Sequence, residues 1–190
     1  MKAVIEQIFA QSIAVKQETL KRNSDKIAQA SQMIIDALKG GHKLLFCGNG
    51  GSAADSQHIA AEFVGRFQKE RKAWPAIALT TDTSALTALG NDYSFDIVFS
   101  RQVQALGQKG DILIGISTSG NSKNVLEALK TAKTMGIKTI GVTGGSGGQL
   151  AALSDIAIIA ASPTTARIQE SHLVIFHAIC EIVENTLCQA

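Results

Sequence analysis

The sequence predicts an α/β protein in which a mostly parallel, five-stranded sheet lies between two layers of helices. Five short runs are continuously apolar rather than alternating, which is typical of strands buried on both faces. Helical patterns separate these runs, so the strands pair in parallel through right-handed crossovers. A chain of 190 residues with 45% hydrophobic residues suits one domain with an ample core. We therefore expect a single three-layer α/β/α sandwich over residues 1–190.

The individual elements follow from the apolar period. Two amphipathic helices are expected at the N-terminus, over 3–22 and 24–39, and Gly40-Gly41 ends the second. They precede the first strand and cannot be crossovers, so residues 1–40 are expected to form a helical extension that packs in an oligomer. The expected strands are 43–47, 75–79, 111–117, 138–142 and 155–160. The other expected helices are about 53–66, 83–89, 95–106, 123–135 and 165–187.

Charge and composition exclude several classes of protein. A formal net charge of +2 gives no basic stripe of the kind that binds nucleic acid. No apolar run approaches the ~18 residues of a membrane span, and the N-terminus shows no apolar core of a signal peptide. The three cysteines, Cys47, Cys180 and Cys188, are odd in number and scattered, which favours reduced thiols. We expect a cytoplasmic protein without nucleic-acid or membrane partners.

The turn over 116–122 is rich in hydroxyl groups and predicts a phosphate site. Ligands of such sheets bind beyond the carboxyl ends of the strands. Here the hydroxyls of Ser117, Thr118, Ser119 and Ser122 adjoin the free N–H groups of an expected helix start, where the helix dipole favours an anion. The Gly-Lys-Ser/Thr signature of a nucleotide-triphosphate loop is missing. The alternative is a simple helix cap by Ser119 or Asn121, but a cap needs only one such residue.

The turn over 47–54 is the first of the two glycine-rich strand-to-helix turns along the chain, and the turn over 116–122 is the second. Gly48, Gly50 and Ala53 fit a weak dinucleotide fingerprint. The acidic residue that should follow about 20 positions later is missing, and Asp82 is too distant. This turn therefore favours close approach of the backbone to a small polar ligand over dinucleotide binding.

Two helices carry candidate chemical groups. Asp55, His58 and Glu62 share one face of the helix that follows the first turn. A histidine and a carboxylate one turn apart suit a metal or acid–base catalysis, although a simple surface contact is the alternative. The last helix is strongly apolar and carries His172 and His177. Because a buried ring nitrogen needs a partner, His172 is interpreted as a core residue that has one.

Five motifs of the sequence form a recognisable set, which is residues 47–52, His58-x-x-x-Glu62, Gly90-Asn91-Asp92, residues 117–122 and Arg167-Ile-Gln-Glu170. Over essentially the whole chain, they resemble the sugar isomerase (SIS) domain family, and most closely its phosphoheptose isomerase members. The resemblance implies an isomerase that converts sedoheptulose 7-phosphate to D-glycero-D-manno-heptose 7-phosphate through an enediol. This is the first step towards ADP-heptose for lipopolysaccharide core. It also implies a cytoplasmic homotetramer with active sites shared between subunits.

The resemblance also implies roles for individual residues. The four hydroxyls of the second turn would hold the phosphate, and the sugar would be lined by Asn49, Gly50, Gly51, Ser52, Asn91 and Asp92. One zinc ion per subunit would be held by His58, Glu62, Gln169 and His177, with Glu62 and Gln169 also near the substrate. Glu62 and His177 match the acid–base pair of the family. Ala166 departs from relatives that have Asp before the Arg-Ile-Gln-Glu motif, so an auxiliary polar contact is expected to be absent.

One alternative is a non-catalytic SIS-domain adaptor of the replication-initiator-associating type, which shares the phosphate loop. That branch lacks the residues matching Glu62 and His177, so their presence here favours the enzyme. Gln169 and His177 are eight residues apart, about 12 Å along a helix. Their side chains can reach one ion only if they point towards each other along the helix. Otherwise one of them comes from a neighbouring subunit. The last helix is apolar on several sides, so we expect other subunits to cover it.

Overall fold

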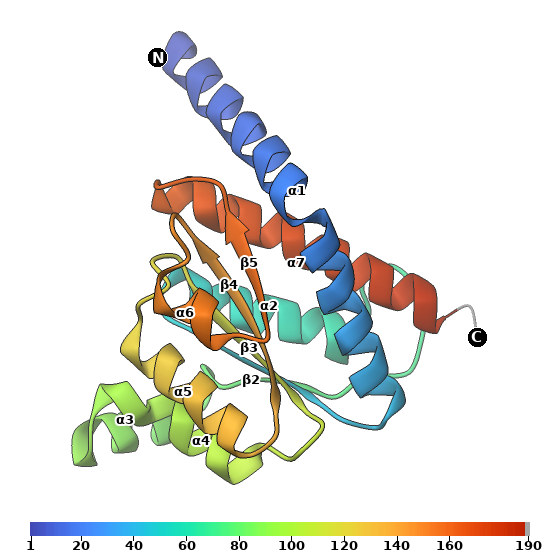
Figure 1. The fold of residues 1–190 in the computed structure, drawn as a ribbon, viewed down its shortest axis with the longest axis vertical. Coiled ribbons are helices and arrows are strands. Elements are labelled where there is room, and N and C mark those ends of the chain that lie inside the picture. Colours follow the sequence, from blue (N-terminus) through green and yellow to red (C-terminus); the bar gives the residue numbers. More distant parts are fainter. Residues whose placement is uncertain (189–190) are drawn as a thin grey trace.

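A computed structural model describes residues 1–188 and confirms the predicted three-layer architecture (Figure 1). The five strands form one sheet in the order β2-β1-β3-β4-β5, and every neighbouring pair is parallel. The strands β1, β3 and β4 are buried over nearly their whole length, as their continuous apolar runs predict. The strand bounds are β1 Leu44–Gly48, β2 Ala76–Ala78, β3 Ile112–Ser117, β4 Lys138–Gly144 and β5 Ile156–Ala160.

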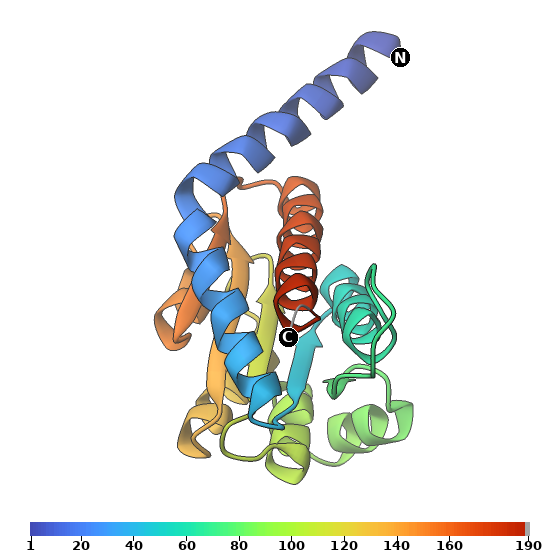
Figure 2. The same cartoon turned by 90° about the vertical axis from the view of Figure 1, so that its right-hand side faces the viewer.

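Helices cover both faces of the sheet. One face carries the second half of α1 (Lys2–Lys39), α7 (Thr165–Leu187) and α2 (Gly51–Val64), which lie side by side in Figure 2. The other face carries α4, α5 and α6, with α3 beside them. Their bounds are α3 Thr83–Asp92, α4 Val98–Leu106, α5 Lys123–Thr134 and α6 Gly148–Leu153, with a 3-10 turn at Phe95–Ile97.

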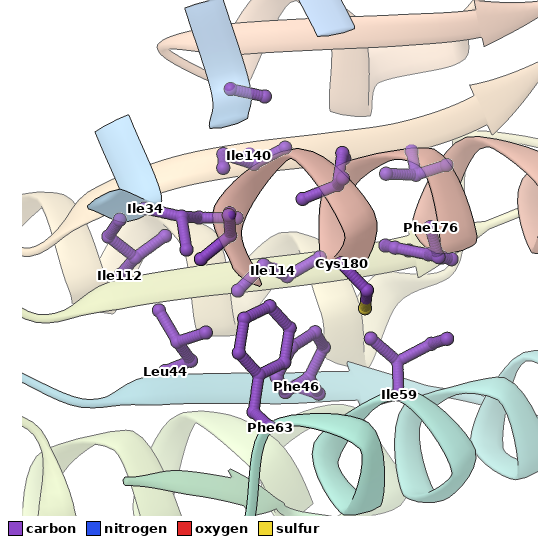
Figure 3. Close-up of a cluster of buried hydrophobic side chains, with 14 of the residues drawn as sticks. Ile34, Leu44, Phe46, Ile59, Phe63, Ile112, Ile114, Ile140, Phe176 and Cys180 are labelled. Carbon is purple, nitrogen blue, oxygen red and sulfur yellow. The ribbon is translucent and has the colours of Figure 1, made fainter. Parts of the chain in front are cut away.

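The core has two parts, one on each face of the sheet. Between the sheet and α2 and α7, the side chains of Phe63, Phe176 and Cys180 gather beside Phe46 of β1 (Figure 3). This packing fixes α2 against α7 and so fixes the side chains that the two helices carry. The second part fills the space between the sheet and α4, α5 and α6.

The prediction of two N-terminal helices is wrong, because α1 continues without a break from Lys2 to Lys39. Asn23, which lies between the two expected helices, and Thr19 are buried and bonded to the strand β5 and the residue that follows it. The Asn23 amide donates to the Ile159 carbonyl and accepts from the Ile159 N–H, while Thr19 accepts the N–H of Ala161. The second half of α1 thus covers the sheet edge and contributes to the core, and the first half projects away from the body (Figures 1 and 2).

Two smaller differences lie on the other face. The sequence analysis expected one helix over 95–106, whereas a 3-10 turn precedes α4, and it missed the short helix α6. The glycine-rich run at 144–148 leads into α6, and glycine lowers helix propensity, so the sequence pattern does not predict this helix. Within residues 1–188, no helix combines the length and apolar character that crossing a membrane requires.

Candidate active site

The hydroxyl-rich turn after β3 forms a compact cradle at the carboxyl end of the sheet. The Ser117 hydroxyl oxygen lies 2.9 Å from that of Ser122 and 3.5 Å from that of Ser119. Ser122 is the N-cap residue of α5, yet its side chain makes no capping hydrogen bond. Ser119 instead accepts the N–H of Asn121, and the side-chain Oδ1 of Asn121 accepts the N–H of Gln149. Neither side chain caps α5, so the hydroxyls and the first N–H groups of the helix remain available to an anion.

The glycine-rich turn over 144–148, which follows β4, packs against this cradle. Gly120 has φ +68°, and a Cβ there would overlap the Gly147 carbonyl, so the close approach requires glycine. The Leu150 N–H donates to the Gly120 carbonyl at 2.9 Å. The turn after β4 therefore fixes the shape of the turn after β3.

The first glycine-rich turn joins the cradle through a pair of amides. Asn49 and Asn124 exchange two hydrogen bonds of 2.8 and 2.9 Å between their side chains. Asn124 lies in the first turn of α5 and was missed by the sequence analysis; it is 3% exposed. Gly50 begins α2 with φ +53°, and Ser52 is buried just after it. The two turns, which follow neighbouring strands β1 and β3, thus form one polar surface.

A histidine–carboxylate–histidine group lies farther along α2. His58 Nε2 is 3.0 Å from Glu62 Oε1, and the His177 ring of α7 meets the His58 ring edge-on at 5.3 Å between centroids. One possible ligand atom from each of His58, Glu62 and His177 lies within 4.8 Å of the others. The contact predicted between the last helix and the His58–Glu62 helix therefore forms within one chain.

Gln169 and Asp55 lie nearer the start of α2. The amide of Gln169 lies against Gly51, where a Cβ would overlap it, so the close packing of α7 on the first turn requires glycine. Asp55 shares the face of His58 and Glu62, and its Oδ2 is buried without a hydrogen-bond partner in the part of the chain that is described. Burial raises the pKa of Asp55, and the nearby His58 lowers it by less.

Asn91 and Asp92 are not brought to this group within one chain. They are exposed at the end of α3, on the other side of the sheet from α2 and α7, and the Asn91 amide donates to Asp92 at 2.8 Å. His172 is buried, and its Nε2 lies 2.9 Å from the Thr143 carbonyl, which confirms its interpretation as a core residue.

A buried ion pair that the sequence pattern does not predict joins the last turns of α7 to the segment after α2. Arg71 Nε lies 3.1 Å from Glu184 Oε1, and the two side chains are 5% and 2% exposed. A charged residue seven positions after His177 in an apolar helix was the available signal, because such residues share a helix face. Its partner lies in an irregular segment that no periodicity marks.

This arrangement defines the class of protein. An anion cradle at the carboxyl edge of a parallel sheet, next to a group able to exchange protons or bind a metal, is typical of an enzyme for a small phosphorylated substrate.

Comparison with known proteins identifies the family. The family model of the SIS domain matches residues 7–144 of this chain. A phosphoheptose isomerase from Aliarcobacter butzleri is 54% identical over 187 residues, covering 97% of each chain.

Solved structures agree with this comparison. A phosphoheptose isomerase from Neisseria gonorrhoeae has a TM-score of 0.92 at 48% identity, covering 97% of this chain and 98% of its own. One from Francisella tularensis has a TM-score of 0.93 at 41% identity, covering 96% of this chain and 97% of its own. The chain therefore belongs to the SIS domain family and, within it, to the phosphoheptose isomerases.

Proposed function

We infer that this chain isomerises sedoheptulose 7-phosphate to D-glycero-D-manno-heptose 7-phosphate, the first step towards the ADP-heptose of lipopolysaccharide core. Its near full-length relatives bear the name of this activity. The observation that carries the inference is the meeting of His177 with His58 and Glu62 beside a phosphate cradle. The cradle suits the phosphate end of the sugar, and the histidine group suits the carbons at the opposite end.

The reaction moves a proton between C1 and C2 and needs a base at carbon and a donor at oxygen. We assign the base to Glu62: its Oε1 pairs with His58, so Oε2 is left for the substrate. We assign the proton transfer at oxygen to His177, which lies across the same group on α7. The hydroxyls of Ser117, Ser119 and Ser122, with Thr118, hold the phosphate. The first turn, from Asn49 to Ser52, approaches the sugar.

The residues of this group also fit a zinc ion. Two imidazoles and one carboxylate are a common catalytic donor set, and their ligand atoms lie within 4.8 Å of one another. We propose that His58, Glu62 and His177 hold one zinc per subunit, each through a single atom, with Gln169 as a further ligand. The second carboxylate oxygen of Glu62 and the second ring nitrogen of His177 then keep the proton-transfer roles. The ion would polarise the carbonyl and stabilise the negative charge of the enediolate.

We further propose a cytoplasmic homotetramer whose active sites are shared between subunits. Asn91 and Asp92 support sharing, because they lie on the other side of the sheet from the histidine group of their own chain. A neighbouring subunit would bring this pair to the sugar. The unpaired thiols Cys47, Cys180 and Cys188 suit a reducing compartment.

The experiment that tests the function is a direct assay of aldoheptose phosphate formation from sedoheptulose 7-phosphate. Turnover that falls after chelation and returns with added zinc supports both the reaction and the metal. The adaptor alternative is not favoured, because the comparisons name an enzyme at high identity. A protein that binds the sugar phosphate but never isomerises it, with or without zinc, would contradict the proposed reaction.

A further inference from the structure

The Arg71–Glu184 pair is buried between the segment after α2 and the last helix. Removing two charges from water is costly, and a buried ion pair is weak evidence for stability. Glu184 lies seven residues after His177, about 10 Å farther along the same face of α7. The pair therefore lies about two turns of α7 beyond His177, at the place where α2 ends.

The Arg71 guanidinium closes the C-terminal end of α2. Its Nη2 donates to the Glu62 carbonyl at 2.7 Å, and its Nη1 donates to the carbonyls of Phe63 and Gly65 at 2.9 and 3.0 Å. The last carbonyls of a helix lack partners within it, and a positive charge there is favoured by the helix dipole. The guanidinium also stacks on the Trp74 ring at 3.7 Å. The main chain of Glu62 is thus held directly by Arg71.

The Glu184 carboxylate holds the segment that follows. It accepts the N–H groups of Phe67, Gln68 and Lys69 at 3.0, 2.7 and 2.8 Å. Burial alone would raise the pKa of Glu184, but these three N–H groups and Arg71 outweigh it and lower the pKa. The Phe67 ring, placed by this contact, lies 5.5 Å from the His177 ring between centroids.

We propose that the Arg71–Glu184 pair is a positioning device for the two reacting side chains. Arg71 fixes the end of α2 that carries Glu62. Glu184 fixes Phe67, whose ring restricts the imidazole of His177. The proposal rests on the proposed function, because it takes Glu62 and His177 as the acid–base pair. A misplacement of reacting groups by about 1 Å costs on the order of 100-fold in rate, so such a device would affect turnover more than substrate binding.

The test compares Arg71→Lys and Glu184→Gln with a matched control. Lysine keeps the charge but cannot reach several carbonyls with one planar group, and glutamine keeps the shape of Glu184 but turns an N–H₂ group towards main-chain donors. The control is Asp111→Asn. Asp111 is also 2% exposed, pairs with Lys43 at 2.6 Å and accepts two main-chain N–H groups. It precedes β3, and its partners lie in the loops before β1 and β3 rather than on α2 or α7.

We expect both site variants to lose about 10- to 100-fold in kcat while KM changes by less than about threefold. Zinc affinity, measured by competition with a chelator, should weaken by about 10- to 100-fold. The Asp111→Asn control should lose thermal stability to a similar degree but keep kcat and zinc affinity. If a site variant fails to fold, Phe67→Leu tests the same link, because it keeps the main-chain bond to Glu184 and removes the ring beside His177.

The outcomes separate this proposal from the proposed function. An active wild type whose Arg71 and Glu184 variants keep kcat and zinc affinity, and lose only stability as the control does, overturns the positioning role. A wild type that binds zinc without isomerase activity contradicts the function, and zinc affinity of the variants then decides the positioning role. A wild type that neither binds zinc nor isomerises the substrate overturns both proposals, because Glu62 and His177 then take part in no reaction.

Discussion

Two carboxylates near the end of α2 have different roles because their surroundings differ. Glu184 is 2% exposed and all its contacts are with main-chain N–H groups and Arg71. Glu184 therefore has a structural role. The Glu62 side chain is 22% exposed, and within residues 1–188 its one hydrogen-bond partner is His58, at Oε1. It is the carboxylate that a substrate can reach, which is why we assign it the role of the base.

Replacing Glu62 by glutamine tests this assignment. The variant keeps the size of the side chain but removes the base, so we expect turnover to fall at least ~100-fold. Binding of the sugar phosphate should persist, because the cradle is untouched. Steady-state kinetics and calorimetric titration measure the two effects. Glu181→Gln, which removes the same charge from an exposed site on α7, should leave both unchanged. Near-wild-type turnover in Glu62→Gln would remove this residue from the mechanism.

His172 predicts a pH dependence of stability. Burial lowers its pKa from 6.5 to about 4, and the hydrogen bond to Thr143 raises it by less. Between these values the unfolded chain binds a proton that the folded chain does not, so stability falls as the pH falls from about 6.5 to 4. The loss reaches about 3 kcal/mol at most. In His172→Leu, thermal melts over this range should depend less on pH than in the wild type. An equal dependence in both proteins would contradict this origin.

At the scale of elements, continuous apolar runs were enough to predict the five strands, and the apolar period was enough to predict most of the helices. The period failed at Asn23, which was left between two expected helices. Asn23 lies inside α1, where it is buried and bonded to β5. The hydroxyls of the second turn and the His58–Glu62 pair were found because their spacing is local. Asn124, Phe67 and the Arg71–Glu184 pair were missed because their partners are distant in the chain.

The turn between β3 and α5 predicts a separation of binding from folding. Ser122→Ala should weaken sugar-phosphate binding with little loss of stability, because its hydroxyl does not cap α5 and solvent replaces it in the empty site. Thr134→Ala, at the other end of α5 with a hydroxyl bonded to the Thr131 carbonyl, is the matched control and should not affect binding. Titration with the substrate and thermal melts measure the two properties. Unchanged binding with a lower melting temperature would instead make this turn a helix cap.

At the scale of the whole molecule, the first half of α1 meets the start of α7 through polar contacts, in which Arg167 donates to the Ile8 carbonyl at 2.8 Å and Ser12 donates to Glu170 at 2.6 Å, but its apolar side chains are left uncovered. It projects from the body (Figure 2) and exposes a row of apolar side chains, which are Val4, Ile5, Ile8, Phe9 and Ile13. Beside its base, α1 and α7 line an apolar cleft of about 250 Å³, next to Leu20 and Val174, which are 61% and 49% exposed. Contiguous exposed apolar surface of this kind marks an interface.

We therefore predict that Phe9→Asp dissociates a homotetramer and abolishes turnover. Phe9 is 66% exposed in the single chain, and a charge there prevents its burial against other subunits. Gln7→Asp is the control, because Gln7 lies on the opposite side of the helix at about 100° per residue. Light scattering and activity are measured together over a dilution series. We expect wild type and control to form a closed tetramer, most simply of dihedral symmetry, with activity lost as the mass falls. Under the proposal that a neighbouring subunit brings Asn91 and Asp92 to the histidine group, a dissociated chain lacks a complete site, and a fully active monomer would contradict both the assembly and the shared site.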